Sequence, residues 1–411
     1  MKRRVVITGL GVVSPIGNGK ETFWQSLCAG KSGISKITSF DALQYSSKIA
    51  GEVKDFDPSA YMLPKDIKHS DRFTQFAVGA ACMAVDDAGI DLTKIDLCKA
   101  GSIIGSGIGG IHTIEREHKV LLSKGPSRVS PFFIPMLIVN MASGMVAIRL
   151  GLKGPNTCSV TACASSNHSI GEAFRVVQNG YADIMFAGGS EAAISPMAVS
   201  GFCAAKALST TNDIPQEASR PFDKHRNGFV MAEGAGIVLL EEYERAKKRK
   251  AYIYAELIGY GMSCDAYHMT APDPDGKGAV RCMQEALKDA RIRSEDVDYI
   301  NAHGTSTVLN DAMETKAIKA VFGGHASRTA VSSTKSMTGH LLGAAGGIEL
   351  AACALSVSRG VITATINYKY PDPECDLDYV PNEARKKQVN IAMSNSLGFG
   401  GHNATIIIKK V

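Results

Sequence analysis

Two segments of this sequence resemble each other at a constant offset. One begins with Asp-Ala-Gly-Ile at Asp87 and the other with Asp-Ala-Arg-Ile at Asp289, and a second aspartate follows each after the same gap. An amphipathic helical pattern precedes each segment, and a strand pattern with glycine comes after it. An internal repeat of this kind predicts two similar α/β halves, because both copies of a duplicated unit form the same elements. We place the halves at residues 1–250 and 251–411.

A second pair of segments supports the repeat. Residues 157–172 begin with β-branched residues, which predict a buried strand, and continue with small residues and then a helical spacing of apolar ones. Residues 333–349 follow the same plan, and a strand expected at 361–366 comes after Gly360. In the first copy, the turn between strand and helix holds Cys163.

Cys163 is a candidate nucleophile because of its place at that turn. Unpaired amide groups and the helix dipole favour an anion at a helix N-terminus, so we expect the thiol to lose its proton more easily there. Small neighbours on both sides of the cysteine would let a substrate approach closely. The alternative is an ordinary core cysteine, which is the interpretation we prefer for the other cysteines of the chain.

Two histidines of the second half could serve such a nucleophile. His303 follows a predicted strand, and His340 precedes the small-residue helix of the second copy. Sites in open α/β sheets lie outside the carboxyl ends of the strands, so related halves would bring Cys163 and both histidines together. Either histidine alone is more often structural, whereas a nucleophile with two such histidines indicates covalent acyl transfer.

Glycine clusters mark two further turns. Phe399 stands between Gly398 and Gly400, which is typical of a mobile gate or of an oxyanion hole, although an ordinary hairpin turn has the same pattern. Residues 105–110 fit the dinucleotide-binding fingerprint formally, but the ribose-binding acid is missing from residues 125–135. We therefore interpret residues 105–110 as a turn that lets the backbone pass near a ligand or a partner subunit.

The bulk composition excludes several classes of protein. Hydrophobic residues make up 45% of the chain and charged residues 21%, and the net charge of +5 gives no indication of nucleic-acid binding. The cysteines form no Cys-x-x-Cys pair, so we expect no zinc site and a reducing, cytoplasmic location. Residues 223–228 imitate a calcium loop without its full set of acids. We expect no signal or transit peptide, and the apolar run at 132–148 is too interrupted for membrane insertion.

Four motifs in this order resemble the β-ketoacyl-[acyl carrier protein] synthases. They are Thr161-Ala162-Cys163-Ala164-Ser165, Asn301-Ala302-His303-Gly304-Thr305, Lys335 with Gly339-His340, and Gly398-Phe399-Gly400-Gly401. Shorter matches at residues 207–209, 220–223 and 270–273 extend the resemblance over nearly the whole chain. The sequence looks most like the type II enzymes, which elongate longer acyl chains in dissociated bacterial or plastid fatty-acid synthesis.

The resemblance implies a thiolase-like fold of two pseudo-repeated halves in five α-β-α-β-α layers, assembled as a homodimer. Cys163 would take the acyl chain from acyl carrier protein as a thioester, and malonyl carrier protein would lose carbon dioxide and attack it to give 3-oxoacyl carrier protein. His303 and His340 would support the decarboxylation and the enolate, and Lys335 would hold their network. The N–H groups of Cys163 and Phe399 would form the oxyanion hole. No cofactor is implied besides the phosphopantetheine arm of the carrier protein.

The resemblance also implies binding residues. Thr305 and Thr307 would contact the phosphopantetheine arm. The other substrate-binding residues would be Ile108, at the far end of the acyl pocket, Thr270 and Gly400. A basic patch for the acidic carrier protein maps onto Lys65, Lys68 and Lys206. Some members hold a structural monovalent ion, whose ligands would here be Asn301, Glu349, Ser394 and Asn395.

Four positions depart from the family pattern without touching the proposed chemistry. Asn310 stands where glycine is common, Thr211 where arginine is common, and His225 and Asn227 where aspartate is common. Thr211 would weaken carrier docking, and Asn310 would alter the turn after the two threonines.

Two alternative functions remain at this stage. One is a related enzyme, namely a type I synthase, a polyketide ketosynthase or a degradative thiolase. A thiolase would need a second active cysteine late in the chain, where Cys353 and Cys375 have no glycine-rich context. The other is a non-catalytic chain-length partner, which would lack the nucleophile that Cys163 supplies.

Overall fold

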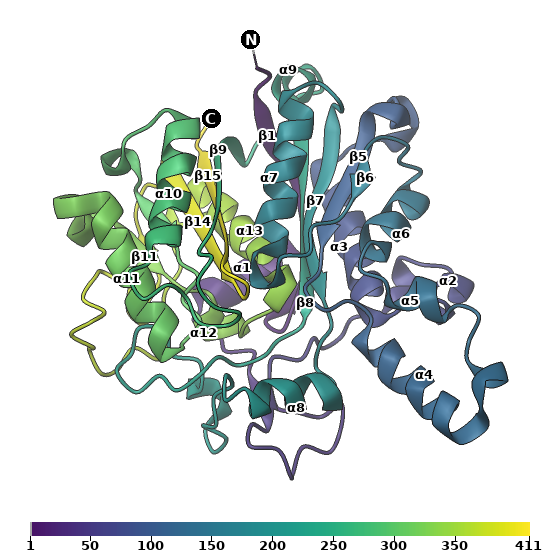
Figure 1. The fold of residues 1–411 in the computed structure, drawn as a ribbon. Helices are drawn as coiled ribbons and strands as arrows, with labels where there is room; N and C mark the ends of the chain where they lie inside the picture. The colour runs from purple at the N-terminus through teal and green to yellow at the C-terminus, as the bar shows by residue number, and fades with distance from the viewer. Residues whose placement is uncertain (1) are drawn as a thin grey trace.

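The computed structural model describes residues 2–411 and contains one large sheet with helices around it (Figure 1). The main strands of the first half are β1 (Val5–Ser14), β5 (Ala100–Gly105), β6 (Asn156–Thr157), β7 (Ile184–Glu191) and β8 (Gly234–Glu242). Those of the second half are β9 (Ala255–Cys264), β10 (Tyr299–Asn301), β11 (Ala330–Ser332), β14 (Ile391–Gly398) and β15 (His402–Lys409). The short strands are β2 (Gly17–Asn18), β3 (Ser35–Lys36), β4 (Ile49–Ala50), β12 (Val361–Ile362) and β13 (Arg385–Lys386).

The helices are distributed over both halves. Before β9 the chain forms α1 (Lys20–Cys28), α2 (Pro64–Lys68), α3 (Arg72–Ala88), α4 (Ile111–Lys124), α5 (Phe133–Leu137), α6 (Met141–Leu150), α7 (Ser165–Gln178), α8 (Pro196–Ala204) and α9 (Tyr243–Lys248). After β9 it forms α10 (Lys277–Ala290), α11 (Val308–Phe322), α12 (Lys335–Thr338) and α13 (Ala345–Arg359). Within residues 2–411, none of these helices has both the length and the apolar content that a membrane crossing requires.

The two halves arrange their strands in the same order. Along the sheet the first half reads β6-β5-β7-β8-β1 and the second reads β11-β10-β14-β15-β9. The three strands farthest from the junction are parallel in each half, and the next two join them in antiparallel pairs. The internal repeat predicted from the sequence is therefore confirmed at the level of topology.

The strands and helices form five layers. Strand β1 pairs with β9 only through Val5, Val6 and Ile7, so the two halves of the sheet diverge beyond this short junction. Helices α7 and α13 pack against each other and against strands of both halves, while α3 and α6 cover the first half and α10 covers the second. Figure 1 shows α7 and α13 in the middle, with α10 and α11 on one outer side and α3 and α6 on the other. This is the thiolase-like architecture expected from the resemblance.

The aspartates that revealed the repeat occupy equivalent places. A carboxylate oxygen of Asp87, near the end of α3, accepts a backbone N–H of β1 at 2.8 Å, and one of Asp289, near the end of α10, accepts a backbone N–H of β9 at 3.0 Å. Close helix–strand contact requires glycine nearby, because a Cβ atom on Gly9 or Gly259 would come within 2.3 Å or 2.5 Å of a helix carbonyl oxygen. Helix α3 is thus fixed on β1 in the same way as α10 is fixed on β9.

Two sequence-based expectations about strands are wrong. The segment from residue 157 was expected as a buried strand, but β6 is an exposed pair of residues at the sheet edge, hydrogen-bonded to β5 alone. The strand expected at 361–366 is only β12, after which the chain makes a single bridge from Thr365 to Pro381. In both places β-branched residues are used in irregular segments next to the functional turns, so local propensity does not decide the structure.

Candidate active site

Cys163 occupies the turn before α7, as the sequence predicted. A single 3-10 turn of Ala162–Ala164 precedes the helix, and Ala162 adopts the left-handed conformation with φ of 50°. The second half repeats this turn before α13, where Leu342 has φ of 49° and Gly343 takes the place of the cysteine. A non-glycine residue in this conformation costs on the order of 1 kcal/mol, so the packing around both turns must hold it.

Both predicted histidines meet this cysteine. The Nε2 atom of His340 lies 3.1 Å from the Sγ atom of Cys163. The ring centroids of His303 and His340 are 5.3 Å apart, and the ligand atoms of all three residues lie within 4.8 Å of one another. Both histidines are almost fully buried. The prediction that these side chains converge from the two halves is therefore correct in this geometry.

A buried ion pair fixes the histidine segment. The ammonium group of Lys335, at the start of α12, pairs with the carboxylate of Glu349 in α13, and both side chains are 1% exposed. The same ammonium donates to the carbonyl oxygen of His303 at 2.7 Å. Glu314 in α11 holds the other side, because its carboxylate accepts the N–H groups of His303 and Gly304 at 2.8 Å each. Burial raises the pKa of Glu314 to about 7, whereas the two N–H groups oppose that rise.

The protonation of the site differs from the expectation for a cysteine at a helix N-terminus. Burial raises the pKa of the Cys163 thiol to about 12, although the charge of Lys335 and the backbone N–H of Phe399 oppose that rise. Burial and the charge of Lys335 also hold the pKa of His340 well below its usual range. Burial, Lys335 and His340 together lower the pKa of His303 in the same direction. The expectation of an easily ionised thiol is thus wrong, because loss of water outweighs the helix terminus.

The glycine-rich turn after β14 lies against the cysteine. A Cβ atom on Gly398 would approach the backbone nitrogen of Cys163 to 3.2 Å, and the backbone N–H of Phe399 points toward the thiol. Gly400 and Gly401 have φ of 84° and 73°, which lets the chain reverse between β14 and β15. The turn is therefore a hairpin that places the backbone N–H of Phe399 beside the thiol of Cys163.

A cavity of about 520 Å³ opens beside the cysteine. The predicted residues on its wall are Cys163, His303, His340, Phe399, Ile108, Thr270, Thr305, Thr307 and Lys206. Gly400 is not part of the wall, and its N–H donates to the carbonyl oxygen of Met269 at 2.8 Å. The glycine cluster around Ile108 does pass close to this cavity, as expected for a ligand-binding turn.

The predicted docking lysines are separated in the single chain. Lys206 is exposed at the cavity wall after α8, with φ of 53°. Lys65 and Lys68 are exposed on the short helix α2, outside the cavity wall. The three lysines therefore form no single patch around the cavity of one chain.

Glu191, at the end of β7, is a site residue that the sequence reasoning missed. Its buried carboxylate accepts the hydroxyl of Ser106 at 2.7 Å and the N–H groups of Gly107, Ile108 and Gly343 at 2.7, 3.2 and 3.0 Å. It thereby joins the Ile108 turn to the turn before α13. The only signal in the sequence was an acid at the end of a largely apolar strand, directly after Gly188-Gly189-Ser190.

The predicted ion-binding residues present unpaired oxygen atoms. Within residues 2–411, the Oδ1 atom of Asn301, the Oγ atom of Ser394 and the Oε2 atom of Glu349 are buried without a hydrogen-bond partner. The Oδ1 atom of Asn395 instead accepts the hydroxyl of Thr405 at 2.9 Å. Unpaired oxygens of this type fit a hard cation, so three of the four expected ligands are compatible with one.

Two of the departures from the family pattern contact each other. The amide nitrogen of Asn227 lies 3.2 Å from the hydroxyl of Thr211, and Asn227 also accepts the hydroxyl of Ser209 at 2.7 Å. The substitutions at these two positions are therefore coupled locally, because Asn227 on the cavity wall contacts Thr211. At Asn310 the side-chain amide donates to the carboxylate of Asp311 at 3.1 Å, so the turn after the threonines gains a hydrogen bond.

Comparison with known sequences identifies the family of this chain. Residues 2–246 match the model of the N-terminal domain of β-ketoacyl synthase, and residues 254–369 match that of the C-terminal domain. A 3-oxoacyl-[acyl-carrier-protein] synthase 2 of Synechocystis sp. is 56% identical over 409 residues, covering 100% of this chain and 98% of that protein. The protein of the same name from Coxiella burnetii is 54% identical over 410 residues, covering 100% and 99%.

Solved structures give the same result. A ketosynthase in complex with its type II polyketide acyl-carrier protein, bound to a hexaketide, is 39% identical with a TM-score of 0.93, and each chain is covered fully. A β-ketoacyl synthase from Burkholderia phymatum is 34% identical, again with a TM-score of 0.93 and full coverage of both chains. With its cysteine, two histidines and lysine in one buried cluster, the chain belongs to the β-ketoacyl synthase family.

Proposed function

We propose that this chain is a 3-oxoacyl-[acyl carrier protein] synthase that catalyses the decarboxylative condensation of type II fatty-acid synthesis. Acyl carrier protein thioester and malonyl carrier protein would give 3-oxoacyl carrier protein, free carrier protein and carbon dioxide. The observation that carries the proposal is the contact between Cys163 and His340 at a 520 Å³ cavity, with His303 beside them. These residues match the roles that the chemistry needs, namely a nucleophile and two groups that stabilise an enolate.

In the first half-reaction the Sγ atom of Cys163 attacks the thioester carbonyl of the acyl carrier protein. The thiol proton passes to the neighbouring Nε2 atom of His340, which is neutral and able to accept it. The carrier protein leaves as a thiol with that proton, and the acyl group stays on Cys163. The N–H groups of Cys163 and Phe399 stabilise the charge that develops on the carbonyl oxygen.

In the second half-reaction the malonyl thioester loses carbon dioxide, and the electrons of the broken C–C bond form an enolate. Burial keeps both histidine rings neutral, and His303 and His340 donate hydrogen bonds to the enolate oxygen once His340 has the tautomer with its hydrogen on Nε2. The enolate carbon attacks the acyl carbonyl, a C–C bond forms, the bond from that carbonyl carbon to Sγ breaks, and the Cys163 thiolate takes up a proton from water. Lys335 does not touch the substrate. Its ammonium group holds the backbone carbonyl oxygen of His303 and thereby positions the ring of that histidine.

The proposed partners are acyl carrier protein and a second copy of this chain. Exposed Lys206 at the cavity wall suits an acidic carrier, and Lys65 and Lys68 would join the patch only if another chain brought α2 close. The exposed edge strand β6 ends the sheet and offers unpaired backbone groups to a second copy. Exposed Phe132, Ile134 and Ile148 support the same face as an interface.

Several finer points belong to the same proposal. The halves would divide at residues 250 and 251, between α9 and β9. No cofactor besides the phosphopantetheine arm enters the chemistry, and a monovalent cation at Asn301, Glu349 and Ser394 would be structural. A cytoplasmic location suits a chain whose ten cysteines are all free thiols.

A condensation assay tests the proposal. The purified protein is mixed with malonyl carrier protein and acyl carrier proteins of increasing chain length, and 3-oxoacyl products are measured by mass spectrometry. We expect product with the native protein and none with Cys163→Ala. Absence of product at every chain length, with carrier proteins that a known synthase accepts, would refute the assignment.

A further inference from the structure

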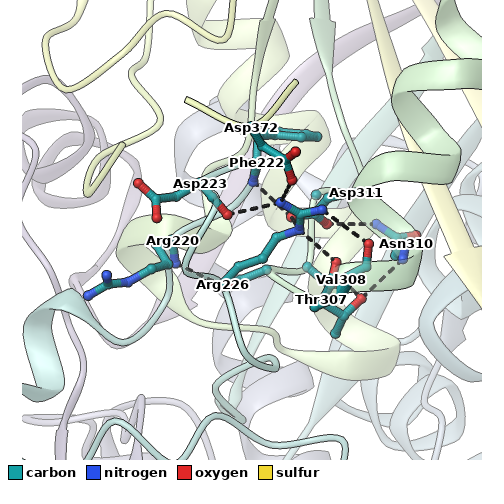
Figure 2. A network of polar contacts seen from close by, with 12 residues as sticks. Arg220, Phe222, Asp223, Arg226, Thr307, Val308, Asn310, Asp311 and Asp372 are labelled. Carbon is teal, nitrogen blue, oxygen red and sulfur yellow. Dashed lines mark hydrogen bonds and ion pairs between the residues drawn. The ribbon is translucent and has the colours of Figure 1, made fainter. Parts of the chain in front are cut away.

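Arg226 is buried between its own loop and two segments that are distant in the sequence, at residues 307–311 and 372 (Figure 2). Its Nε and Nη2 atoms donate to the carbonyl oxygens of Thr307 and Val308 at 3.2 Å each, and Nη1 donates to that of Asp223 at 2.9 Å. The side chain is 2% exposed and does not belong to the cavity wall. Its contacts therefore hold backbone that leads into the cavity without reaching a substrate.

Two carboxylates balance this guanidinium. The Oδ2 atom of Asp311, in α11, lies 3.7 Å from Nε and also accepts the N–H of Phe222 at 2.8 Å. Asp372 forms an ion pair with Nη1 from the other side, as Figure 2 shows. A planar guanidinium can satisfy two acids and several carbonyl oxygens at once, which a lysine cannot do. The arrangement thus depends on arginine rather than on positive charge alone.

The carbonyl groups held by Arg226 belong to the start of α11. Thr307 is the N-cap of this helix, and its hydroxyl lies 3.0 Å from that of Thr305. Both threonines are on the cavity wall. The carbonyl oxygen of Thr307 already accepts the N–H of Asp311 at 3.2 Å, so Arg226 adds a second hydrogen bond to it. Fixing that peptide group fixes the direction of both hydroxyls before a ligand arrives.

We infer that Arg226 is a positioning residue for the phosphopantetheine arm of the substrates, acting through the carbonyl oxygens of Thr307 and Val308. The inference rests on the proposed function, because the arm is the ligand that Thr305 and Thr307 would contact. Arg226 does not take part in the chemistry at Cys163. Its loss weakens binding of the arm and leaves the reacting groups in place.

The test compares two lengths of substrate arm in Arg226→Lys. This variant keeps the charge that balances Asp311 and Asp372 but loses the planar fork. Acyl and malonyl thioesters of pantetheine are compared with the same thioesters of N-acetylcysteamine, which lack most of the arm. We expect the preference in kcat/KM for the long arm to fall about tenfold, with little change for the short one. An equal loss for both substrates would show a purely structural role and overturn the inference.

Arg249→Lys is the matched control. Arg249 pairs with buried Glu241 and donates to the carbonyl oxygen of Ala88 at 2.7 Å, outside the cavity wall. The Arg249→Lys variant should have a lower free energy of unfolding, as the Arg226→Lys variant should, but an unchanged preference between the two substrate lengths.

A binding measurement separates this inference from the proposed function. Calorimetry with an unreactive acyl pantetheine amide gives a Kd without any condensation. We expect the Kd to rise about tenfold in Arg226→Lys and to stay unchanged in Arg249→Lys. An unchanged Kd in both variants refutes the role of Arg226, whereas the absence of 3-oxoacyl product from the native protein refutes the proposed function alone.

Discussion

The Nε2 atom of His340 lies 3.1 Å from the Sγ atom of Cys163. Burial raises the pKa of the thiol and lowers the pKa of the imidazole, so it favours the neutral form of both groups. The resting pair is therefore a thiol beside a neutral imidazole, unlike a thiolate–imidazolium pair. Burial raises the pKa of the thiol to about 12, so below that pH its ionised fraction increases about tenfold for each unit by which the pH rises. The alkylation rate of Cys163 by iodoacetamide should rise steadily from about pH 6 to about pH 10.

Mass spectrometry of the labelled peptide measures this rate for Cys163 alone. Exposed Cys98 in the same sample serves as the internal reference for an accessible thiol. A plateau in the Cys163 rate near neutral pH would contradict the neutral pair.

Cys163 and His303 should be separable by mutation, since they serve different half-reactions. Cys163→Ala removes the nucleophile, so acyl labelling and condensation should vanish while some malonyl decarboxylation remains. Cys163→Gln should decarboxylate better still, because its amide can occupy the oxyanion hole as the acylated cysteine does. His303→Ala should still accept radiolabelled acyl groups on Cys163 but release carbon dioxide poorly. Stable acyl labelling of Cys163→Ala at another residue would contradict this assignment.

Lys335→Met should destabilise the protein and abolish condensation. It leaves the buried carboxylate of Glu349 without its partner, which costs about 3–5 kcal/mol in the free energy of unfolding. The double variant Lys335→Met with Glu349→Leu should recover most of that stability, because no unpaired charge remains. It should not recover activity, because the carbonyl oxygen of His303 still lacks its donor. Urea denaturation and the condensation assay measure the two effects separately, and recovery of activity would contradict the role of Lys335.

Glu191→Gln should change the chain-length preference. The amide has one acceptor oxygen instead of two and turns its NH2 group toward backbone donors, so the turn that carries Ile108 would shift. We expect reduced kcat/KM for long acyl chains and a smaller effect on short ones, the same direction as for Ile108→Phe, which fills the cavity directly. Competition between acyl carrier proteins of different length gives the profile. Uniform loss at all lengths would indicate misfolding instead.

Charge reversal at the proposed docking lysines should weaken carrier binding. Lys206→Glu and Lys65→Glu should each raise KM for acyl carrier protein severalfold at low salt, and the difference from the native protein should shrink as salt screens the charges. Lys288→Glu, at an exposed position of α10, is the control and should leave KM unchanged. An unchanged KM for Lys206→Glu at low salt would exclude this face.

Much of the architecture could be predicted from the sequence because its signals are periodic or repeated. The segments at Asp87 and Asp289 indicated the duplication, and the patterns around Cys163 and Phe399 predicted the turns where the two halves meet. The convergence of His303 and His340 followed from one rule about strand ends. Such patterns can be recognised in the sequence because each helix, strand or turn of a given kind requires the same local arrangement of residues.

The remaining parts of the site depend on burial, which a linear pattern does not contain. Glu191 and Glu314 are acids that become fully buried and then collect backbone N–H groups from other segments. Arg226 lies in a segment that resembles a calcium loop, and only the folded chain shows its carbonyl and carboxylate partners. The expected thiol pKa was wrong for the same reason, since the helix terminus is local and the loss of water is not.

The second copy of the nucleophile turn has a consequence for the ancestry of the molecule. Leu342 keeps the strained backbone of Ala162, yet Gly343 has no side chain, and its N–H is given to Glu191. A symmetric ancestor made of two identical halves would have held two such turns with equal roles. In the present chain one turn holds the sulfur of Cys163, and the other is joined through Glu191 to the Ile108 turn at the cavity wall. Symmetry was thus retained in the backbone and lost in the side chains, so that each half now depends on the other for a working centre.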